Sequence, residues 1–156
     1  MSGSMLAPGA GAFLIVRALG RNFALPVGCT RSVFRVEGLT RAPLAPPCLL
    51  GVVSLRGRLV AVACLNRRLR PDAEPLGVGS LAVLIELGPD ALALAVEDVG
   101  VVVEARREDF LDAKRRLNAP PRAVGLGVLR QAGTMQGLGT VLDVRALFDF
   151  RRTIAA

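Results

Sequence analysis

Residues 51–65 constrain the fold of this chain more than any other stretch. They contain two short apolar runs, residues 51–55 and 59–65, on either side of the charged corner Arg56-Gly57-Arg58. Short runs that are rich in valine and bounded by glycine are typical of buried strands. Because glycine adopts positive φ at little cost, the corner predicts a tight hairpin turn that carries two guanidinium groups.

The arginines of this corner allow two interpretations. A guanidinium group presents five donors in a fixed fork, which suits a bidentate bond with a carboxylate of another protein. Arg56 and Arg58 are therefore either solvated side chains on an ordinary turn or part of a protein-binding surface. The local sequence leaves both interpretations open.

The rest of the chain also reads mainly as short strands. Apolar runs at 13–17 and 23–27 flank a polar turn, and runs at 81–87 and 91–96 flank Gly88-Pro89-Asp90, so each pair predicts a hairpin. Further strands are expected at 101–104, 124–129 and 138–143. Helical spacing is confined to 30–36, 108–117 and 144–148. Many short strands with few helices predict an all-β fold built from small barrels, and a weak echo of residues 55–69 in 128–147 suggests a duplicated unit.

The residue types exclude several classes of function. Among the 156 residues there is no histidine, which removes the commonest general base and the commonest zinc ligand. The three cysteines, Cys29, Cys48 and Cys64, are widely spaced and form no C-x-x-C motif, so we expect buried, reduced thiols. The acids Glu97, Asp98 and Glu104 lie where solvated charge is the simplest interpretation. We therefore expect no enzyme activity, no metal and no cofactor.

The charge balance raises a second class of partner. The net charge is +7, almost wholly from arginine, which is compatible with an anionic ligand. A basic β-barrel that binds single-stranded nucleic acid is the alternative function. The scarcity of aromatic residues, six Phe with no Trp or Tyr, argues against it, because bases stack on aromatic side chains.

The central stretch resembles the signature of the CheW family, G-V-[IV]-N-L-R-G-x-[IV]-[VL]-P-V-[IV]-D-L-R. Several positions depart from it, among them Ser54, where Asn is usual, Ala61, where Pro is, Cys64, where Asp is, and Asn66, where Arg is. The flanks agree with the family pattern as well, through the opening hairpin, the proline-rich approach at 40–47 and the closing strands and helical turn. The positions that match the signature are Gly51, Val52, Val53, Leu55, Arg56, Gly57, Leu59, Val60, Val62 and Leu65.

The resemblance implies a fold and a role. CheW-like proteins consist of two intertwined five-stranded β-barrels of SH3 or OB type with a few short helices. They are non-catalytic scaffolds that couple the cytoplasmic tips of chemoreceptors to the regulatory domain of a CheA-type histidine kinase. The departures suggest a divergent paralogue, such as one serving a pilus-type pathway. Exposed strand edges would also allow self-association.

The resemblance also implies binding residues. In the family, a groove between the barrels takes a receptor helix. The family acid that could pair with the signature arginine is replaced here by Ser32, so Arg56 either points to solvent or awaits a carboxylate of a partner. The positions that match this receptor-binding groove, and that the resemblance therefore implies as protein-binding residues, are Thr30, Val33, Gly51, Leu55, Arg56, Gly57 and Asp98.

We expect one CheW-like domain at 12–150, with a flexible N-terminal tail at 1–11 and a C-terminal tail at 151–156. The charge-free run at 42–55 is too short to span a bilayer and carries three prolines, so no membrane insertion is expected. The chain is predicted to be cytoplasmic, with recruitment to membrane-associated receptor arrays implied by the resemblance.

Overall fold

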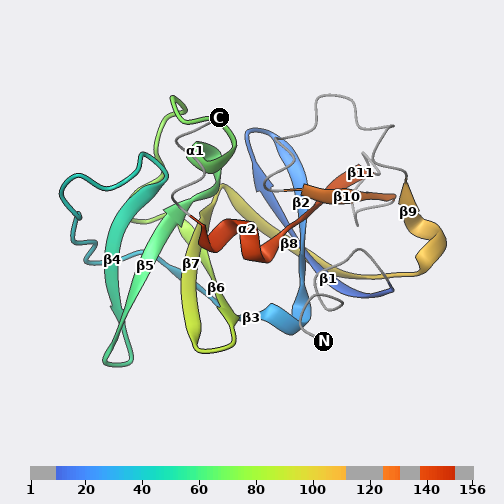
Figure 1. The fold of residues 1–156 in the computed structure, drawn as a ribbon, viewed down its shortest axis with the longest axis horizontal. Helices are drawn as coiled ribbons and strands as arrows, with labels where there is room; N and C mark the ends of the chain where they lie inside the picture. The colour runs from blue at the N-terminus through green and yellow to red at the C-terminus, as the bar shows by residue number, and fades with distance from the viewer. Residues whose placement is uncertain (1–9, 112–124, 131–137, 150–156) are drawn as a thin grey trace.

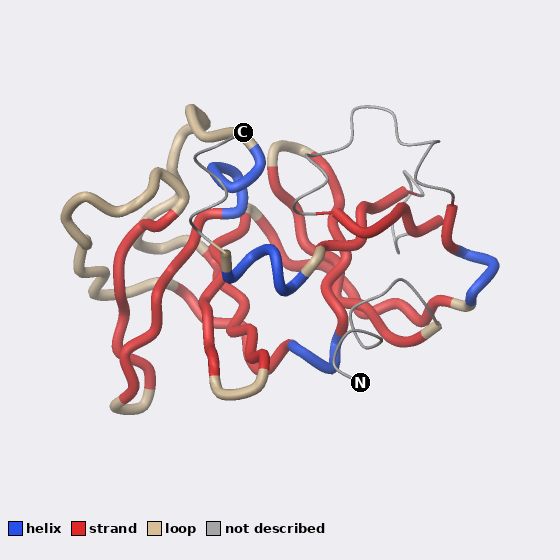
Figure 2. Tube along the Cα trace, viewed as in Figure 1, coloured by secondary structure: helices blue, strands red, loops and turns tan. Residues whose placement is uncertain are grey.

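A computed structural model describes residues 10–111, 125–130 and 138–149, and in it the chain forms two β-sheets with short helices between them (Figure 1). Sheet A has six strands in the order β8-β1-β2-β11-β10-β9, and sheet B has five in the order β3-β6-β7-β5-β4. Strands dominate the described trace (Figure 2), which confirms the predicted all-β class.

The bounds of the elements are as follows. Sheet A contains β1 (Gly11–Ala18), β2 (Arg21–Pro26), β8 (Asp98–Ala105), β9 (Phe110–Leu111), β10 (Gly125–Arg130) and β11 (Leu138–Leu142). Sheet B contains β3 (Thr30–Arg35), β4 (Leu49–Leu55), β5 (Arg58–Cys64), β6 (Leu81–Leu87) and β7 (Asp90–Val96). The described helical segments are η1 (Val27–Cys29), α1 (Leu65–Leu69), η2 (Arg107–Asp109) and α2 (Val144–Phe148).

The two sheets share one topology, which confirms the internal echo. In sheet B the hairpin β6–β7 is flanked on one side by β3 and on the other by the hairpin β4–β5, with β5 parallel to β7. In sheet A the hairpin β1–β2 is flanked in the same way by β8 and by β10–β11, with β11 parallel to β2. A short helix follows the hairpin β4–β5 in one unit and the hairpin β10–β11 in the other: α1 comes after β5, and α2 comes after β11.

The sheets do not close into the predicted barrels. Hydrogen bonding leaves each sheet open, with β3 and β4 at the two edges of sheet B. The edges are brought together by the segment that follows each outer strand: Thr40, after β3, forms an isolated bridge with Val52 of β4, and β9, after β8, pairs with β10. A single bridge and a two-residue strand cannot extend the ladder further, so both sheets curl without closing.

The core explains why the two units form one body. The largest cluster of buried residues takes side chains from both sheets, including Leu14 and Phe23 of sheet A and Ile85 and Leu94 of sheet B, together with Leu147 of α2. Since neighbouring side chains along a strand point to opposite faces, the alternate residues of each sheet build two smaller clusters on the other faces. The strand β7 is buried from Leu92 to Val96, as its wholly apolar sequence predicts.

Two buried polar side chains of α1 tie the units together. Arg68 donates to the carbonyl oxygens of Ala146 (2.6 Å) and Asp149 (3.3 Å) at the end of α2. Asn66 donates to Glu97 (3.1 Å), whose other carboxylate oxygen accepts from the backbone of Gly20 in the β1–β2 turn (3.1 Å). The bond to Glu97 gives the N–H of Gly20 in the turn a partner. Arg68 adds a charged donor at the end of α2, where the carbonyl oxygen of Ala146 also accepts from the backbone of Asp149 (3.2 Å).

Two local expectations are wrong. The segment 30–36, read as a turn or short helix, forms the edge strand β3, because pairing with β6 overrides its weak helical spacing. Of the helix expected at 108–117, the described part is the 3₁₀ turn η2 and the short strand β9, while 112–117 lies outside the described residues. Phe110 instead packs edge-to-face on Phe13 of β1, with ring centroids 5.7 Å apart.

Candidate protein-binding surface

The predicted signature hairpin is confirmed, and its turn is tight. Leu55 pairs with Arg58, which leaves Arg56 and Gly57 as the two central residues, with φ of 51° and 77°. Positive φ at both positions is the mark of a type I′ turn, whose twist matches that of the flanking strands. An arginine in the left-handed region costs about 1–2 kcal/mol relative to ordinary backbone, so the turn holds Arg56 outward at some expense of stability.

The turn lies at the same end of sheet B as the β6–β7 turn and the start of β3 (Figure 1). There, Glu86 of β6 accepts from Arg31 of β3 (2.7 Å) and from Arg58 of β5 (3.2 Å), and Arg58 also donates to the carbonyl oxygen of Pro89 (3.2 Å). One carboxylate therefore engages two guanidinium groups from strands on either side of the β6–β7 hairpin. We call this end, defined by Arg31, Arg56, Arg58 and Glu86, the basic end.

Arg56 is the arginine of the basic end that stays unpaired. Its side chain is exposed, and within the described part of the chain it makes no hydrogen bond or ion pair, while Glu86 is bound by Arg31 and Arg58. Ser32, at the position of the family acid, is exposed on β3. The exposed guanidinium group agrees with both possibilities stated for Arg56, a side chain in solvent and one that awaits a carboxylate of a partner.

The other predicted site residues fall into three places. Leu55 is partly buried against the smaller cluster of sheet B, directly before the turn. Thr30 and Val33 lie on β3: the Thr30 hydroxyl donates to the carbonyl oxygen of Val27 (3.0 Å), and the Val33 side chain is 45% exposed. Asp98 begins β8 in sheet A, where its carboxylate accepts from the backbone of Val99 (2.9 Å) and its strand pairs with β1.

Gly51 is buried and belongs to the fold rather than to an exposed surface. Its φ is 153°, which L-residues rarely adopt, and a Cβ there would overlap the carbonyl oxygen of Thr40. Thr40 and Val52 exchange two backbone hydrogen bonds of 2.9 and 2.8 Å at this point. Glycine is therefore required for the bridge that draws the open edges of sheet B together.

Comparison with known proteins identifies the family of this chain and a solved structure with a similar fold. Residues 12–152 match the family model of the CheW-like domain. The chain belongs to the CheW-like family. The fold of this CheW-like chain is similar to that in the crystal structure of the scaffolding protein TtCheW from Thermoanaerobacter tengcongensis, with a TM-score of 0.77 and 16% sequence identity, over 90% of this chain and 93% of that one. No curated protein matched the chain.

Sequence reasoning missed part of the basic end of this CheW-like domain. The apolar run of β6 gives no sign that Glu86 reaches two arginines, because that depends on the pairing of β3, β6, β7 and β5. Arg58 was noticed as a charged corner residue, but its bond to Pro89 joins two hairpins that are distant in sequence.

The three cysteines, Cys29, Cys48 and Cys64, are buried, as predicted, and none forms a disulfide. Burial raises the pKa of the Cys29 thiol, with nearby Arg31 acting in the opposite direction. Across residues 10–111, 125–130 and 138–149, no group of three or more candidate ligands could hold a metal ion. The same residues contain no helix with the length and apolar composition needed to cross a membrane.

Proposed function

We propose that this CheW-like chain is a non-catalytic adaptor that couples chemoreceptors to a CheA-type histidine kinase. The observation that carries the proposal is Arg56, an exposed guanidinium group held on a strained turn with its neighbouring acid already engaged. Such a group gains most when a partner supplies a carboxylate, because charge-assisted bonds to a fork of donors are both strong and directional.

We propose the basic end as the kinase contact, which assigns Arg56 to the kinase and not to the receptor groove that the resemblance implies. Next to Arg56, the side chain of Leu59 is 76% exposed, so the turn presents an apolar group beside a charged one. Interfaces commonly combine an arginine anchor with adjoining apolar surface. We propose that the regulatory domain of the kinase contributes the carboxylate.

For the receptor we propose a contact through β3 and β8. Val33 on the edge strand β3 supplies exposed apolar surface, and Asp98 with Thr30 adds polar groups that differ from the apolar or small residues usual in the family. Gly51 acts indirectly, by holding the sheet to which β3 belongs. These changes, with those at Ser54, Ala61 and Cys64, favour a partner other than a typical flagellar receptor, and we propose a pilus-type array as the setting.

The chain's chemistry agrees with an adaptor. The sequence has no histidine. The carboxylate of Glu97 accepts hydrogen bonds from the Asn66 side chain and from the backbone of Gly20, and not from a second carboxyl group.

The experiment is a pull-down of the full chain by the purified regulatory domain of the CheA-type kinase from the same organism, at about 0.05 M and about 0.5 M salt. We expect binding at both concentrations, because apolar contacts accompany the arginine. Failure to bind the kinase, together with salt-sensitive retention on single-stranded DNA, would overturn the proposal in favour of the nucleic-acid alternative. The described phenylalanines are buried or half-buried, which argues against that outcome.

A further inference from the structure

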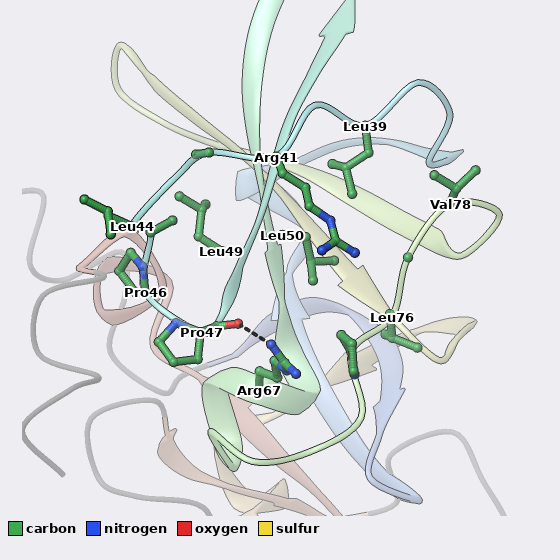
Figure 3. Close-up of a pocket in the computed structure, with 14 residues that line it drawn as sticks. Leu39, Arg41, Leu44, Pro46, Pro47, Leu49, Leu50, Arg67, Leu76 and Val78 are labelled. Atoms are coloured by element: carbon green, nitrogen blue, oxygen red, sulfur yellow. Dashed lines mark hydrogen bonds between the residues drawn. The ribbon is translucent and has the colours of Figure 1, made fainter.

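A concave site lies at the opposite end of β4 and β5 from the Arg56 turn. It is a cavity of about 600 Å³ between the proline-rich loop that precedes β4 and the loop that precedes β6. Figure 3 shows these two loops on opposite sides of the cavity, with strand and helix residues between them. Cavities of this size are typical of sites that bind part of a ligand or of a partner chain.

Part of the wall of the cavity is apolar, and the core holds this part in place. Leu39, Leu50 and Leu76 line it, and all three also pack against the smaller core cluster of sheet B, so the core holds their positions. Around the rim, Val78 is 70% exposed and Leu44 is fully exposed. Leu44 also has a φ of 59°, a conformation that costs a leucine about 1–2 kcal/mol. An exposed leucine held in a strained conformation at the mouth of an apolar cavity is a feature that a ligand would stabilise.

Two arginines make the cavity cationic as well as apolar. Arg67 of α1 is held in place by bonds to the carbonyl oxygens of Ala73 (2.9 Å) and Pro47 (3.3 Å), which use two of its five N–H donors. Arg41, on the proline-rich loop, is exposed and has no hydrogen-bond or ion-pair partner in the described part of the chain. The lining contains no acidic side chain, and Glu74, although next to Pro75 in the chain, does not line the cavity.

We propose that this cavity binds a short acidic–apolar peptide segment of a partner protein. A carboxylate of the segment would bind between Arg41 and Arg67, and an aliphatic or aromatic side chain would enter between Leu50 and Leu76. A peptide suits the site better than a small molecule, since only an occupant that extends past the cavity would also cover Leu44 on the rim. The site is separate from the basic end, so it adds a second docking surface.

The test selects from a library of random heptapeptides displayed on phage, using the full chain as bait. The strongest peptide is then measured by fluorescence anisotropy against four variants. Arg41→Glu and Leu44→Ser alter the cavity at exposed side chains, while Arg107→Glu and Leu59→Ser make the same changes at exposed positions outside it. Circular dichroism checks that each variant is folded.

We expect the selected peptides to share a Glu or Asp within a few residues of a large apolar side chain. Arg41→Glu should weaken binding by about tenfold or more, the effect of losing one charge-assisted contact, and Leu44→Ser by about threefold to tenfold. Arg107→Glu and Leu59→Ser should bind as the wild type does. Absence of an acidic–apolar consensus, or equal loss in the Arg41 and Arg107 variants, would overturn the proposal. The proposal would also be overturned if the chain bound sodium dodecanoate while no peptide was enriched, since the cavity would then be a site for small amphipathic carboxylates.

Discussion

Replacing Gly51 by alanine should destabilise the protein severely, although it adds only one methyl group to the edge strand β4. The new Cβ would overlap the carbonyl oxygen of Thr40, so the Thr40 segment must move away from β4. That movement breaks the two hydrogen bonds between Thr40 and Val52, at about 0.5–1.5 kcal/mol each. Holding alanine at a φ of 153° adds about 1–3 kcal/mol.

Together these terms lower the free energy of unfolding by about 2–6 kcal/mol, out of the roughly 5–15 kcal/mol typical of a domain. With a urea m-value of about 2 kcal/mol/M, the midpoint of unfolding should fall by about 1–3 M. The assay is urea unfolding followed by far-UV circular dichroism.

Gly28 provides the matched control for this assay. It is exposed, has no positive φ, and has no atom within 4 Å of the position its Cβ would occupy. Gly28→Ala should therefore shift the midpoint little. A loss below about 0.5 kcal/mol in Gly51→Ala would show that the close approach of Thr40 is not what requires glycine, and would return Gly51 to consideration as a direct partner contact.

Three further predictions concern stability. Arg68→Ala should lower the free energy of unfolding by about 2–4 kcal/mol in urea titrations, because it leaves two carbonyl groups at the end of α2 without their charged donor, whereas Arg70→Ala, at an exposed pair, should cost less than about 1 kcal/mol. Burial raises the pKa of the Cys29 thiol, so the contribution of Cys29 to stability is complete below the unfolded thiol pKa of about 8.5 and declines as pH rises through the higher folded value. Cys29→Ser should therefore reduce the loss of stability that the wild type shows at alkaline pH. An unchanged dependence of stability on pH would contradict this. At the turn, thermal melting should show Arg56→Asn nearly neutral and Arg56→Val about 1–2 kcal/mol less stable, since asparagine tolerates the left-handed region and a β-branched residue does not; equal melting would contradict a type I′ turn.

Much of the fold follows from local sequence. Each confirmed hairpin has apolar runs of strand length around a glycine that adopts positive φ, as at Gly20, Gly57 and Gly88. Because these signals lie within about ten residues of one another, they need no knowledge of tertiary contacts. The run at 91–96, apolar at every position, correctly predicted burial on both faces.

The expectations that failed depend on contacts between distant segments. β3 forms because β6 is available to pair with it, and the open sheets meet only through Thr40 and β9, whose partners lie elsewhere in the chain. The basic end was half predicted: Arg56 stood out beside Gly57, but the capture of Arg31 and Arg58 by Glu86 depends on strand register. The cavity was not foreseen, because its wall comes from three segments that are separate in sequence.

The most direct test of the central claim is the dissociation constant of the complex with the kinase regulatory domain, measured by isothermal titration calorimetry for the wild type, Arg56→Asn and Arg107→Asn. Arg56→Asn removes the guanidinium group and keeps the turn, and Arg107 is an exposed arginine on η2, far from the basic end (Figure 1). We predict that Arg56→Asn weakens binding by about 10- to 150-fold, the loss of about 1.5–3 kcal/mol from a charge-assisted contact, while Arg107→Asn binds as the wild type does. Equal affinity of all three proteins would contradict the assignment of Arg56 as the group that binds the partner.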